Sequence, residues 1–278
     1  MIEIKDIENK IVHDDCLNVL KQLPDKCIDM ILTSPPYDNL RNYGDTLVWS
    51  FDVFKKIAKQ LTRVLKQNGC IVWVVADAVI DGSETGTSFK QALYFKKIGL
   101  NLHDTMIYQK QNPSPNTSNK TKYQQCFEYM FVFSKGMPKT VNLLLEKRHN
   151  ETNDKRTFRI KHFNRGVDGD FKEKRFYVIK DIVPRTNIWK YKVGFGNSAK
   201  NKIAFEHPAI FPEQLACDHI VSWSKENDLV LDCFSGSGTT AVVCSELKRR
   251  FICIEKNEQY YELSCRRLEE YNRQLKLF

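Results

Sequence analysis

Four consecutive residues near the amino end of the chain combine properties suited to holding an amino group. They are Ser34, Pro35, Pro36 and Tyr37, and they end the apolar run that starts at Asp29. Two prolines fix the backbone and remove two amide donors, which leaves carbonyl groups free to accept hydrogen bonds. The Ser34 hydroxyl and the Pro35 carbonyl are therefore suited to bind an amine, and Tyr37 offers a flat face to a planar ring. Without further context, the same tetrapeptide is only a rigid turn.

A second segment, near the carboxyl end, predicts a ligand-binding turn between a strand and a helix. It reads Leu229-Val-Leu-Asp-Cys-Phe-Ser-Gly-Ser-Gly-Thr-Thr-Ala241, an apolar run followed by glycines. Gly236 and Gly238 allow the backbone to turn sharply and approach a ligand, and Thr239 can cap the helix that follows. A phosphate-binding P-loop is excluded because no Gly-Lys-Ser or Gly-Lys-Thr follows the glycines.

The spacing of these glycines fits more than one cofactor. Gly236, Gly238 and Ala241 also match the dinucleotide fingerprint, so the glycines alone do not name the ligand. The run Phe251–Glu255 reads as a second strand that ends in an acid. A carboxylate at that place accepts hydrogen bonds from ribose hydroxyls. Together, the turn and Glu255 indicate an adenosine-type cofactor.

Short apolar runs alternate with longer segments of helical period along most of the chain. This alternation predicts an α/β protein with a mostly parallel sheet and helices on both faces. The predicted strands are Ile11–His13, Ile28–Thr33, Cys70–Ala76, Leu102–Tyr108, Phe127–Ser134, Val230–Cys233 and Phe251–Glu255. The clearest predicted helix is Phe51–Gln67, ended by Asn68-Gly69, and Glu258–Leu275 is another. The Ser34–Tyr37 segment and the turn with Gly236 and Gly238 then each follow the carboxyl end of a strand, where ligands bind in such sheets.

The composition is that of a globular protein with excess positive charge. Of 278 residues, 42% are hydrophobic and 28% are charged, and the net charge is +9. The longest apolar stretch spans about ten residues, whereas a membrane helix needs about twenty. The amino end lacks the basic start and apolar run of a secretory signal, which predicts a cytoplasmic protein. Nine cysteines without a C-x-x-C pair, together with scattered histidines, predict no metal site.

The alternation breaks between Pro138 and Thr186, which we call the basic segment. It contains 13 Lys and Arg against seven Asp and Glu, so it carries +6 of the total charge, with aromatic residues interleaved. It is either a solvated basic insertion or a surface that meets phosphates with Lys and Arg and meets bases with other side chains. On the second interpretation, the candidate DNA-binding residues are Arg156, Arg159, Lys161 and Arg165.

The order of these features resembles that of the beta group of DNA amino-methyltransferases. Those enzymes methylate an exocyclic amine of cytosine or adenine and use S-adenosylmethionine as cofactor. The family places its catalytic tetrapeptide first, then a target-recognition region, then the cofactor loop. Here Ser34–Tyr37, the basic segment and Phe234–Thr240 follow one another in that order. The likeness covers most of the chain.

The resemblance assigns roles that residue spacing leaves open. It implies that Asp15-Cys16 contacts the cofactor adenine, and that Phe234–Thr240 binds the methionine part while Glu255 binds the ribose. His207–Glu213 resembles the segment that closes over the methionine moiety, and Phe127–Lys135 resembles the strand after the target-base pocket. The implied cofactor-binding residues are Asp15, Cys16, Phe211, Asp232, Phe234, Gly236, Ser237, Gly238, Thr239, Thr240 and Glu255, and the implied catalytic residues are Ser34, Pro35, Pro36 and Tyr37.

The family's fold is a circularly permuted, Rossmann-like methyltransferase fold in which the first strand lies beside the last. It implies a mostly parallel seven-stranded sheet with an antiparallel edge hairpin made by Leu102–Tyr108 and Phe127–Ser134. Residues 1–136 are then the catalytic half of the methyltransferase domain, 137–186 an inserted basic target-recognition region, and 187–278 the cofactor-binding half. We call Ser34–Tyr37 the proline turn and Phe234–Thr240 the glycine turn. The two turns are expected to face one shared cleft.

The resemblance implies a site-specific methyltransferase that acts on a flipped-out base of double-stranded DNA. The Ser-Pro-Pro-Tyr form resembles enzymes acting on cytosine N4. Adenine N6 stays an alternative, because either amine can donate to a hydroxyl and a carbonyl. A nicotinamide-dependent oxidoreductase would explain the glycines and Glu255 but not Ser34–Tyr37, and a non-catalytic DNA-binding module would explain only the charge. A homodimer, a cognate restriction endonuclease and the recognition sequence are left open.

Overall fold

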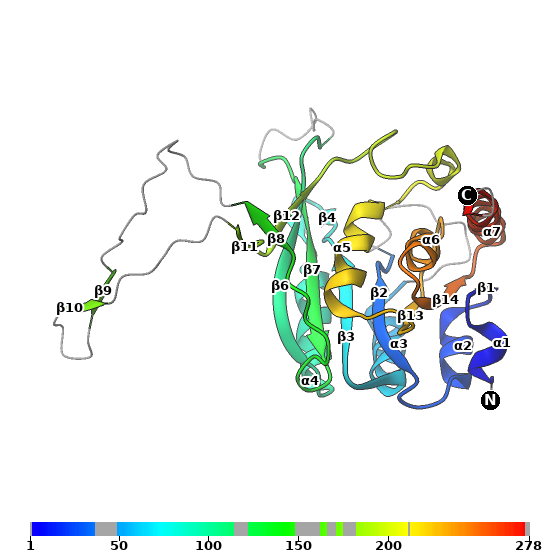
Figure 1. The fold of residues 1–278 in the computed structure, drawn as a ribbon, viewed down its shortest axis with the longest axis horizontal. Helices are drawn as coiled ribbons and strands as arrows, with labels where there is room; N and C mark the ends of the chain where they lie inside the picture. The colour runs from blue at the N-terminus through cyan, green and yellow to red at the C-terminus, as the bar shows by residue number, and fades with distance from the viewer. Residues whose placement is uncertain are drawn as a thin grey trace. The chain divides into compact units, whose positions relative to one another are not determined.

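An eight-stranded sheet organises the larger part of the chain (Figure 1). The computed structural model describes residues 2–36, 49–113, 122–147, 162–165, 171–174, 182–210 and 212–275, with backbone alone at 162–165 and 171–174. The strands of the sheet are β1 (Lys10–His13), β2 (Ile28–Thr33), β3 (Leu65–Val75), β6 (Asn101–Lys110), β7 (Phe127–Ser134), β12 (Ile188–Tyr191), β13 (Leu229–Asp232) and β14 (Arg250–Glu255). Their order across the sheet is β1-β14-β13-β2-β3-β7-β6-β12.

The first five strands in that order run parallel, whereas β7 is antiparallel to both of its neighbours. The first strand of the chain therefore lies beside the last, with His13 opposite Glu255, as the resemblance implied. The predicted number of seven strands is wrong, because β12 adds an eighth strand parallel to β6. The hairpin of β6 and β7 consequently lies one strand in from the edge. Only Trp189 and Tyr191 of β12 are buried, too short an alternation to stand out in the sequence.

Helices cover both faces of this sheet. They are α1 (Ile4–Ile7), α2 (Cys16–Gln22), α3 (Phe51–Val64), α4 (Thr87–Lys97), α5 (Glu213–Trp223), α6 (Thr239–Glu246) and α7 (Glu258–Leu275), with a short 3-10 helix η1 (Lys202–Glu206). The helices α2, α3 and α4 pack in succession, and so do α5, α6 and α7. None of the described helices is both long and apolar enough to cross a lipid bilayer.

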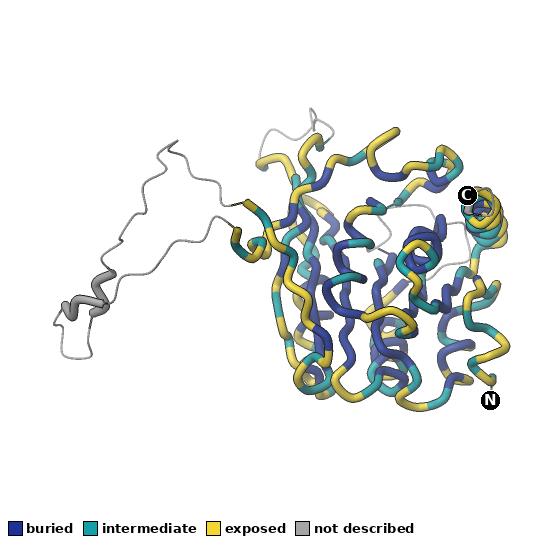
Figure 2. The backbone as a smooth tube through the Cα atoms, in the orientation of Figure 1, coloured by how far each residue is buried: buried dark blue, intermediate teal, exposed yellow. Residues whose placement is uncertain are grey.

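The central strands are buried on both faces, as Figure 2 shows by their dark blue colour. Alternate residues of β3, such as Ile71 and Trp73, join one core cluster with residues of α2, α3 and α4. The residues between them, such as Val72, are equally buried on the opposite face. Burial on both faces explains why these strands read as continuous apolar runs.

The helix predicted for Phe51–Gln67 ends earlier, at Val64. From Leu65 the chain is already part of β3, where Leu65 pairs with Ile28 before the register shifts. Asn68 adopts a positive φ of 66° within this strand. A Cβ on Gly69 would lie 2.7 Å from the Asp29 carbonyl oxygen, so a glycine is required there. The Asn-Gly pair therefore marks an irregularity in the strand rather than the end of the helix.

The chain divides into two contact units: residues 1–142 with 187–278, and residues 143–186. The smaller unit contains two antiparallel pairs, β8 (Leu145–Lys147) with β11 (Ile182–Pro184) and β9 (His162–Arg165) with β10 (Phe171–Lys174). A two-stranded pair of β4 (Val79–Ile80) and β5 (Ser83–Glu84) belongs to the larger unit.

The first residues of the basic segment belong to the larger unit, not to the smaller one. Lys139 forms ion pairs with Asp29 and Asp228, and the backbone and side-chain amides of Asn142 donate to carbonyls of α5. The smaller unit begins at Leu143.

Candidate active site

The proline turn and the glycine turn leave the carboxyl ends of adjacent parallel strands. In the pairing of β2 with β13, Met30 lies opposite Val230 and Ile31 opposite Leu231. Because the two strands run in the same direction, both turns leave the sheet at the same edge. They line one cavity of about 990 Å³, and its walls include Asp15, Cys16, Ser34, Pro35, Pro36, Trp49, Phe234, Ser235, Gly236, Ser237, Thr239 and Glu255. The shared cleft expected from the sequence is therefore present.

A buried carboxylate joins the two turns directly behind this cavity. Asp232, at the end of β13, is 1% exposed and accepts hydrogen bonds from the hydroxyls of Thr33 at 2.7 Å and Thr240 at 2.6 Å. It also accepts one from the backbone amide of Phe234 at 3.1 Å. Burial raises the pKa of Asp232, and these hydrogen bonds oppose the increase. The carboxylate thereby fixes the residue before Ser34 to both ends of the glycine turn.

The glycine turn adopts left-handed backbone conformations at both of its glycines. The φ angles of Gly236 and Gly238 are 51° and 76°, a region that other residues rarely adopt. Gly238 is the N-cap residue of α6, and no side chain caps the helix. The prediction that Thr239 caps it is therefore wrong. The Thr239 hydroxyl instead accepts a hydrogen bond from Arg267 at 3.0 Å.

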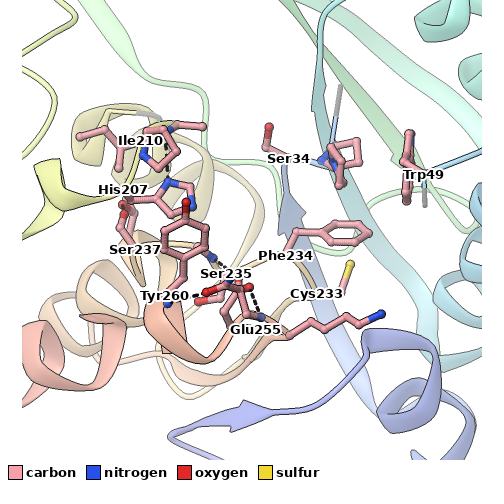
Figure 3. A pocket seen from close by; sticks show the side chains of 18 of the residues that line it. Ser34, Trp49, His207, Ile210, Cys233, Phe234, Ser235, Ser237, Glu255 and Tyr260 are labelled. Carbon is pink, nitrogen blue, oxygen red and sulfur yellow. Dashed lines mark hydrogen bonds between the residues drawn. The ribbon is translucent and has the colours of Figure 1, made fainter. Parts of the chain in front are cut away.

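Glu255 supports the glycine turn from the neighbouring strand β14. One carboxylate oxygen accepts a hydrogen bond from the backbone amide of Gly236 and the other accepts one from the backbone amide of Asn257, each at 2.8 Å (Figure 3). Burial raises the pKa of Glu255, which these two hydrogen bonds oppose. An ionised carboxylate has about four acceptor positions, so Glu255 keeps acceptor capacity toward the cavity that it lines.

The imidazole of His207 covers the glycine turn from the other side. A Cβ on Gly236 would lie 3.1 Å from this ring, so the ring and the turn are in close contact. The ring lies edge-on to the Tyr260 ring, with centroids 4.2 Å apart, and its Nδ1 accepts a hydrogen bond from the backbone amide of Ala209. His207 and Tyr260 both line the cavity (Figure 3). Phe211, predicted from the same segment, lies outside the described residues.

The proline turn carries an aromatic neighbour that sequence reasoning missed. Pro35 and Pro36 are buried and, with Ser34, line the cavity. Trp49 joins them, and its ring lies edge-on to Phe234 at 5.5 Å between centroids. A single tryptophan before a helix has no distinctive spacing, and only the fold brings it to this edge. Tyr37 lies outside the described residues.

Asp15 and Cys16 line the cavity where α2 begins. The Asp15 carboxylate caps this helix by accepting the amide of Leu17, and it pairs with Lys256 at 3.1 Å. Cys16 lies beside Cys233, whose thiol has its pKa raised by burial and, secondarily, by Cys16. Cys16 is therefore next to the strand end that carries the glycine turn, and Asp15 is next to the end of β14.

The far wall of the cavity contains a polar group that the sequence did not indicate. Tyr108 and Lys110 come from β6 and Glu128 from β7, and all three line the cavity. Lys110 pairs with Glu128 at 2.7 Å, and burial raises the pKa of Tyr108, with a further contribution from Glu128. These residues lie at the ends of predicted strands, but nothing in their spacing marked them as functional.

Several predicted residues lie behind the cavity rather than on its surface. Asp232, Gly238 and Thr240 are not part of its lining, and Asp232 holds Thr240 from within the core. Arg156, Arg159 and Lys161 lie outside the described residues, and only the backbone of Arg165 is described, in β9. Within the described ranges, no group of three His, Cys, Asp or Glu side chains is arranged to hold a metal ion.

Comparison with known proteins agrees with this geometry. Residues 28–266 match the N6/N4 methyltransferase family, described as DNA methylase. The chain is 48% identical over 252 residues to the orphan methyltransferase M.BamHII of Bacillus amyloliquefaciens, covering 90% of this chain and 92% of that protein.

Two solved structures share the fold. The PvuII DNA methyltransferase, named as cytosine-N4-specific, has a TM-score of 0.67 at 20% identity and covers 96% of this chain and 92% of its own. The complex of M1.HpyAVI with S-adenosylmethionine has a TM-score of 0.59 at 24% identity, with 93% and 98% covered. At these identities the likeness concerns the fold alone. The match of the family over most of the chain, together with the close relative, shows that this protein belongs to the N6/N4 family of DNA methylases.

Proposed function

We propose that this protein transfers a methyl group from S-adenosylmethionine to the exocyclic N4 amine of a cytosine in DNA. The observation that carries the proposal is the single cavity lined by both Ser34–Pro36 and the glycine turn. A methyl group moves between two bound molecules only if both are held side by side. Two turns on adjacent parallel strands, joined by Asp232, provide that arrangement.

The glycine-turn side of the cavity fits an adenosine-type cofactor. Glu255 offers acceptor oxygens for ribose hydroxyls, and the turn brings backbone groups close to the ligand without intervening side chains. Asp15, Cys16 and Phe234 also line the cavity. When bound, S-adenosylmethionine would supply an electrophilic methyl group on a sulfonium.

The proline-turn side fits the amine that receives the methyl group. An exocyclic amine is a weak nucleophile, because its lone pair is delocalised into the ring of the base. Hydrogen bonds from its two N–H groups to the Ser34 hydroxyl and the Pro35 carbonyl favour a pyramidal nitrogen with the lone pair directed at the methyl group. This role combines orientation with electrostatic stabilisation and needs no covalent intermediate.

The target base has to leave the DNA duplex to reach this cavity. Flipping a base costs a few kcal/mol. Stacking of the flipped base on Tyr37 offsets about 1–3 kcal/mol of that cost. Typical ligand sites enclose about 300–1,000 Å³. The cavity, at about 990 Å³, lies at the upper end of this range.

We assign the DNA contacts to the basic segment, where Arg156, Arg159, Lys161 and Arg165 would neutralise backbone phosphates. Reversing the charge of the first three should weaken DNA binding and flatten its dependence on salt, because fewer counterions are then released. Filter binding across a salt series measures both quantities. Unchanged binding at physiological salt would remove this segment from the interface.

The choice of cytosine N4 over adenine N6 rests on the Ser-Pro-Pro-Tyr form of the tetrapeptide. Incubation of unmethylated DNA with tritiated S-adenosylmethionine, followed by nucleoside separation, tests this choice. We expect the label in N4-methylcytosine, and label found only in N6-methyladenine would contradict it. Calorimetric titration tests the cofactor separately, with binding of S-adenosylmethionine and none of NAD as the expected result.

A further inference from the structure

The carboxyl-terminal helix α7 inserts a buried arginine behind the glycine turn. Arg267 is 1% exposed, although arginine is among the residues least often buried in proteins. It does not line the cavity. Its neighbour in sequence, Arg266, is 56% exposed and pairs with Glu206 at the surface. The two arginines thus provide a buried and an exposed version of the same side chain on one helix.

One guanidinium nitrogen of Arg267 holds three acceptors of the turn. Nη1 donates to the carbonyl oxygen of Ser237 at 2.8 Å, to the Ser237 hydroxyl at 3.1 Å and to the Thr239 hydroxyl at 3.0 Å. Ser237 and Thr239 flank Gly238, and both line the cavity. The hydrogen bonds therefore reach the turn from the side opposite the ligand.

A second residue of α7 touches the turn between these contacts. A Cβ on Gly238 would lie 2.9 Å from the Cβ of Ser264, so the backbone of the turn rests against α7. Ser264 and Arg267 are three residues apart and lie on one face of the helix. This face therefore sets both how closely the turn approaches α7 and how its polar groups are oriented.

The other end of the guanidinium is anchored on α5. Nη2 donates to Glu213 at 2.6 Å, and the second oxygen of Glu213 accepts the amide of Lys200. Burial lowers the pKa of Arg267, and Glu213 opposes the decrease. The Nε atom is buried without a partner among the described residues. Burying the Arg267 charge costs desolvation free energy. Its hydrogen bonds to the glycine turn offer a functional reason for that cost.

From this geometry we infer that Arg267 is a positioning residue that holds the Ser237–Thr239 backbone in the shape required to bind the cofactor. The inference rests on the proposed function, because it concerns the affinity for S-adenosylmethionine. Arg267 does not line the cavity, so on this inference it acts through the turn. Lysine at this position keeps a positive charge but lacks the planar fork whose two nitrogens reach the turn and Glu213 at the same time.

The test is calorimetric titration of the full chain with S-adenosylmethionine, using R267K, R267M and the surface control R266M. Titration separates two effects, because unfolded protein lowers the number of sites per chain while a displaced turn raises Kd. We expect R267M to raise Kd about 10- to 100-fold, as loss of outer residues that orient a binding group does at metal sites. R267K should raise Kd less, and R266M should stay within about twofold of the unmodified protein.

Wild-type Kd in both Arg267 variants, with only the number of sites reduced, would overturn the inference and leave Arg267 a purely structural residue. If R267M does not fold, R267K decides, since it keeps the buried charge paired. Failure of the unmodified protein to bind S-adenosylmethionine is a different result, because it removes the proposed function and the inference with it.

Discussion

The two turns that line the cavity are kept rigid in different ways. The proline turn carries its rigidity in its own residues, since Pro35 and Pro36 restrict the backbone wherever they occur. The glycine turn is intrinsically pliant, and its shape comes from residues on other elements. Glu255 binds the amide of Gly236, and Arg267 binds the groups on either side of Gly238.

Within one site, the proline turn is therefore rigid by its own sequence, whereas the glycine turn is held by contacts with other elements. The glycine side can bring its backbone close to a ligand because Gly236 and Gly238 have no side chains, so other elements must fix these two positions. The proline side presents a hydroxyl and a carbonyl, which its own prolines already fix in place. Substitutions on the two sides should consequently affect different steps of the reaction.

The largest expected effect comes from Gly236→Val, which breaks the glycine side alone. Valine is strained at a φ of 51°, and its Cβ would lie 3.1 Å from the His207 ring. We expect the affinity for S-adenosylmethionine to fall by more than about 100-fold in calorimetric titration. Gly99→Val is the control for strain, because Gly99 has a φ of 100° with open space around it. Normal affinity in Gly236→Val would separate the turn from the cofactor.

Ser34→Ala tests the proline side. Loss of the hydroxyl removes one of the two acceptors proposed for the amine, so we expect kcat to fall about 10- to 100-fold. Cofactor affinity should stay within about twofold, because the glycine turn is untouched. Single-turnover methylation and calorimetry measure the two quantities, with Ser34→Thr as the variant that keeps a hydroxyl. Weakened cofactor binding at unchanged kcat would exchange the roles of the two turns.

Asp232→Ala removes the carboxylate that links the proline turn to the glycine turn. The hydroxyls of Thr33 and Thr240 and the amide of Phe234 lose their acceptor in the core, which costs about 2 kcal/mol or more of unfolding free energy. Urea unfolding measures the loss, and cofactor affinity and kcat should decrease together. Asp228→Ala, at a partly exposed ion pair, should cost about 1 kcal/mol at most. Loss of only one of the two activities would show that Asp232 does not couple the turns.

The smallest expected effect is a pH dependence on the cofactor side. Burial raises the pKa of Glu255 above its usual value of 4.5, so the carboxylate takes up a proton at a higher pH than an exposed glutamate does. Protonation removes an acceptor for the ribose hydroxyls. We therefore expect affinity for S-adenosylmethionine to decrease as pH is lowered from about 7 toward about 5. Glu255→Gln should bind more weakly at neutral pH and lose this dependence, and an equally steep profile in that variant would assign the titration elsewhere.

Local patterns predicted the elements and the two turns because short-range rules decide them. The strands Ile28–Thr33 and Phe127–Ser134 and the helix Glu258–Leu275 have the predicted bounds. The error at Val64 arose because Asn-Gly marks a helix end in most settings, whereas here the pairing of Leu65 with Ile28 takes precedence. Tertiary pairing, which a local pattern does not contain, decided that boundary.

The supporting residues of the site could not be predicted in the same way. In the sequence, Arg267 belongs to a helix rich in Glu and Arg, which is typical of an exposed surface. Its burial depends on α5 and the glycine turn, which lie more than 25 residues away along the chain. Trp49 likewise reaches the cavity only through the fold, whereas His207 lies in a segment that the resemblance had indicated. The sequence pointed to Ser34 and Gly236, which line the cavity, but not to Arg267, which holds the glycine turn from behind.

The pairing of β1 with β14 has a consequence for synthesis of the protein. Glu8 pairs with Arg250, which is synthesised 242 residues later, and Thr33 binds Asp232, which is synthesised 199 residues later. At about 5–20 residues per second, the ribosome needs roughly ten seconds or more to deliver those partners. During that time β2 lacks its neighbour β13, and an apolar strand edge stays open to other chains. Nascent polypeptides released before the last two strands emerge should consequently bind chaperones or aggregate.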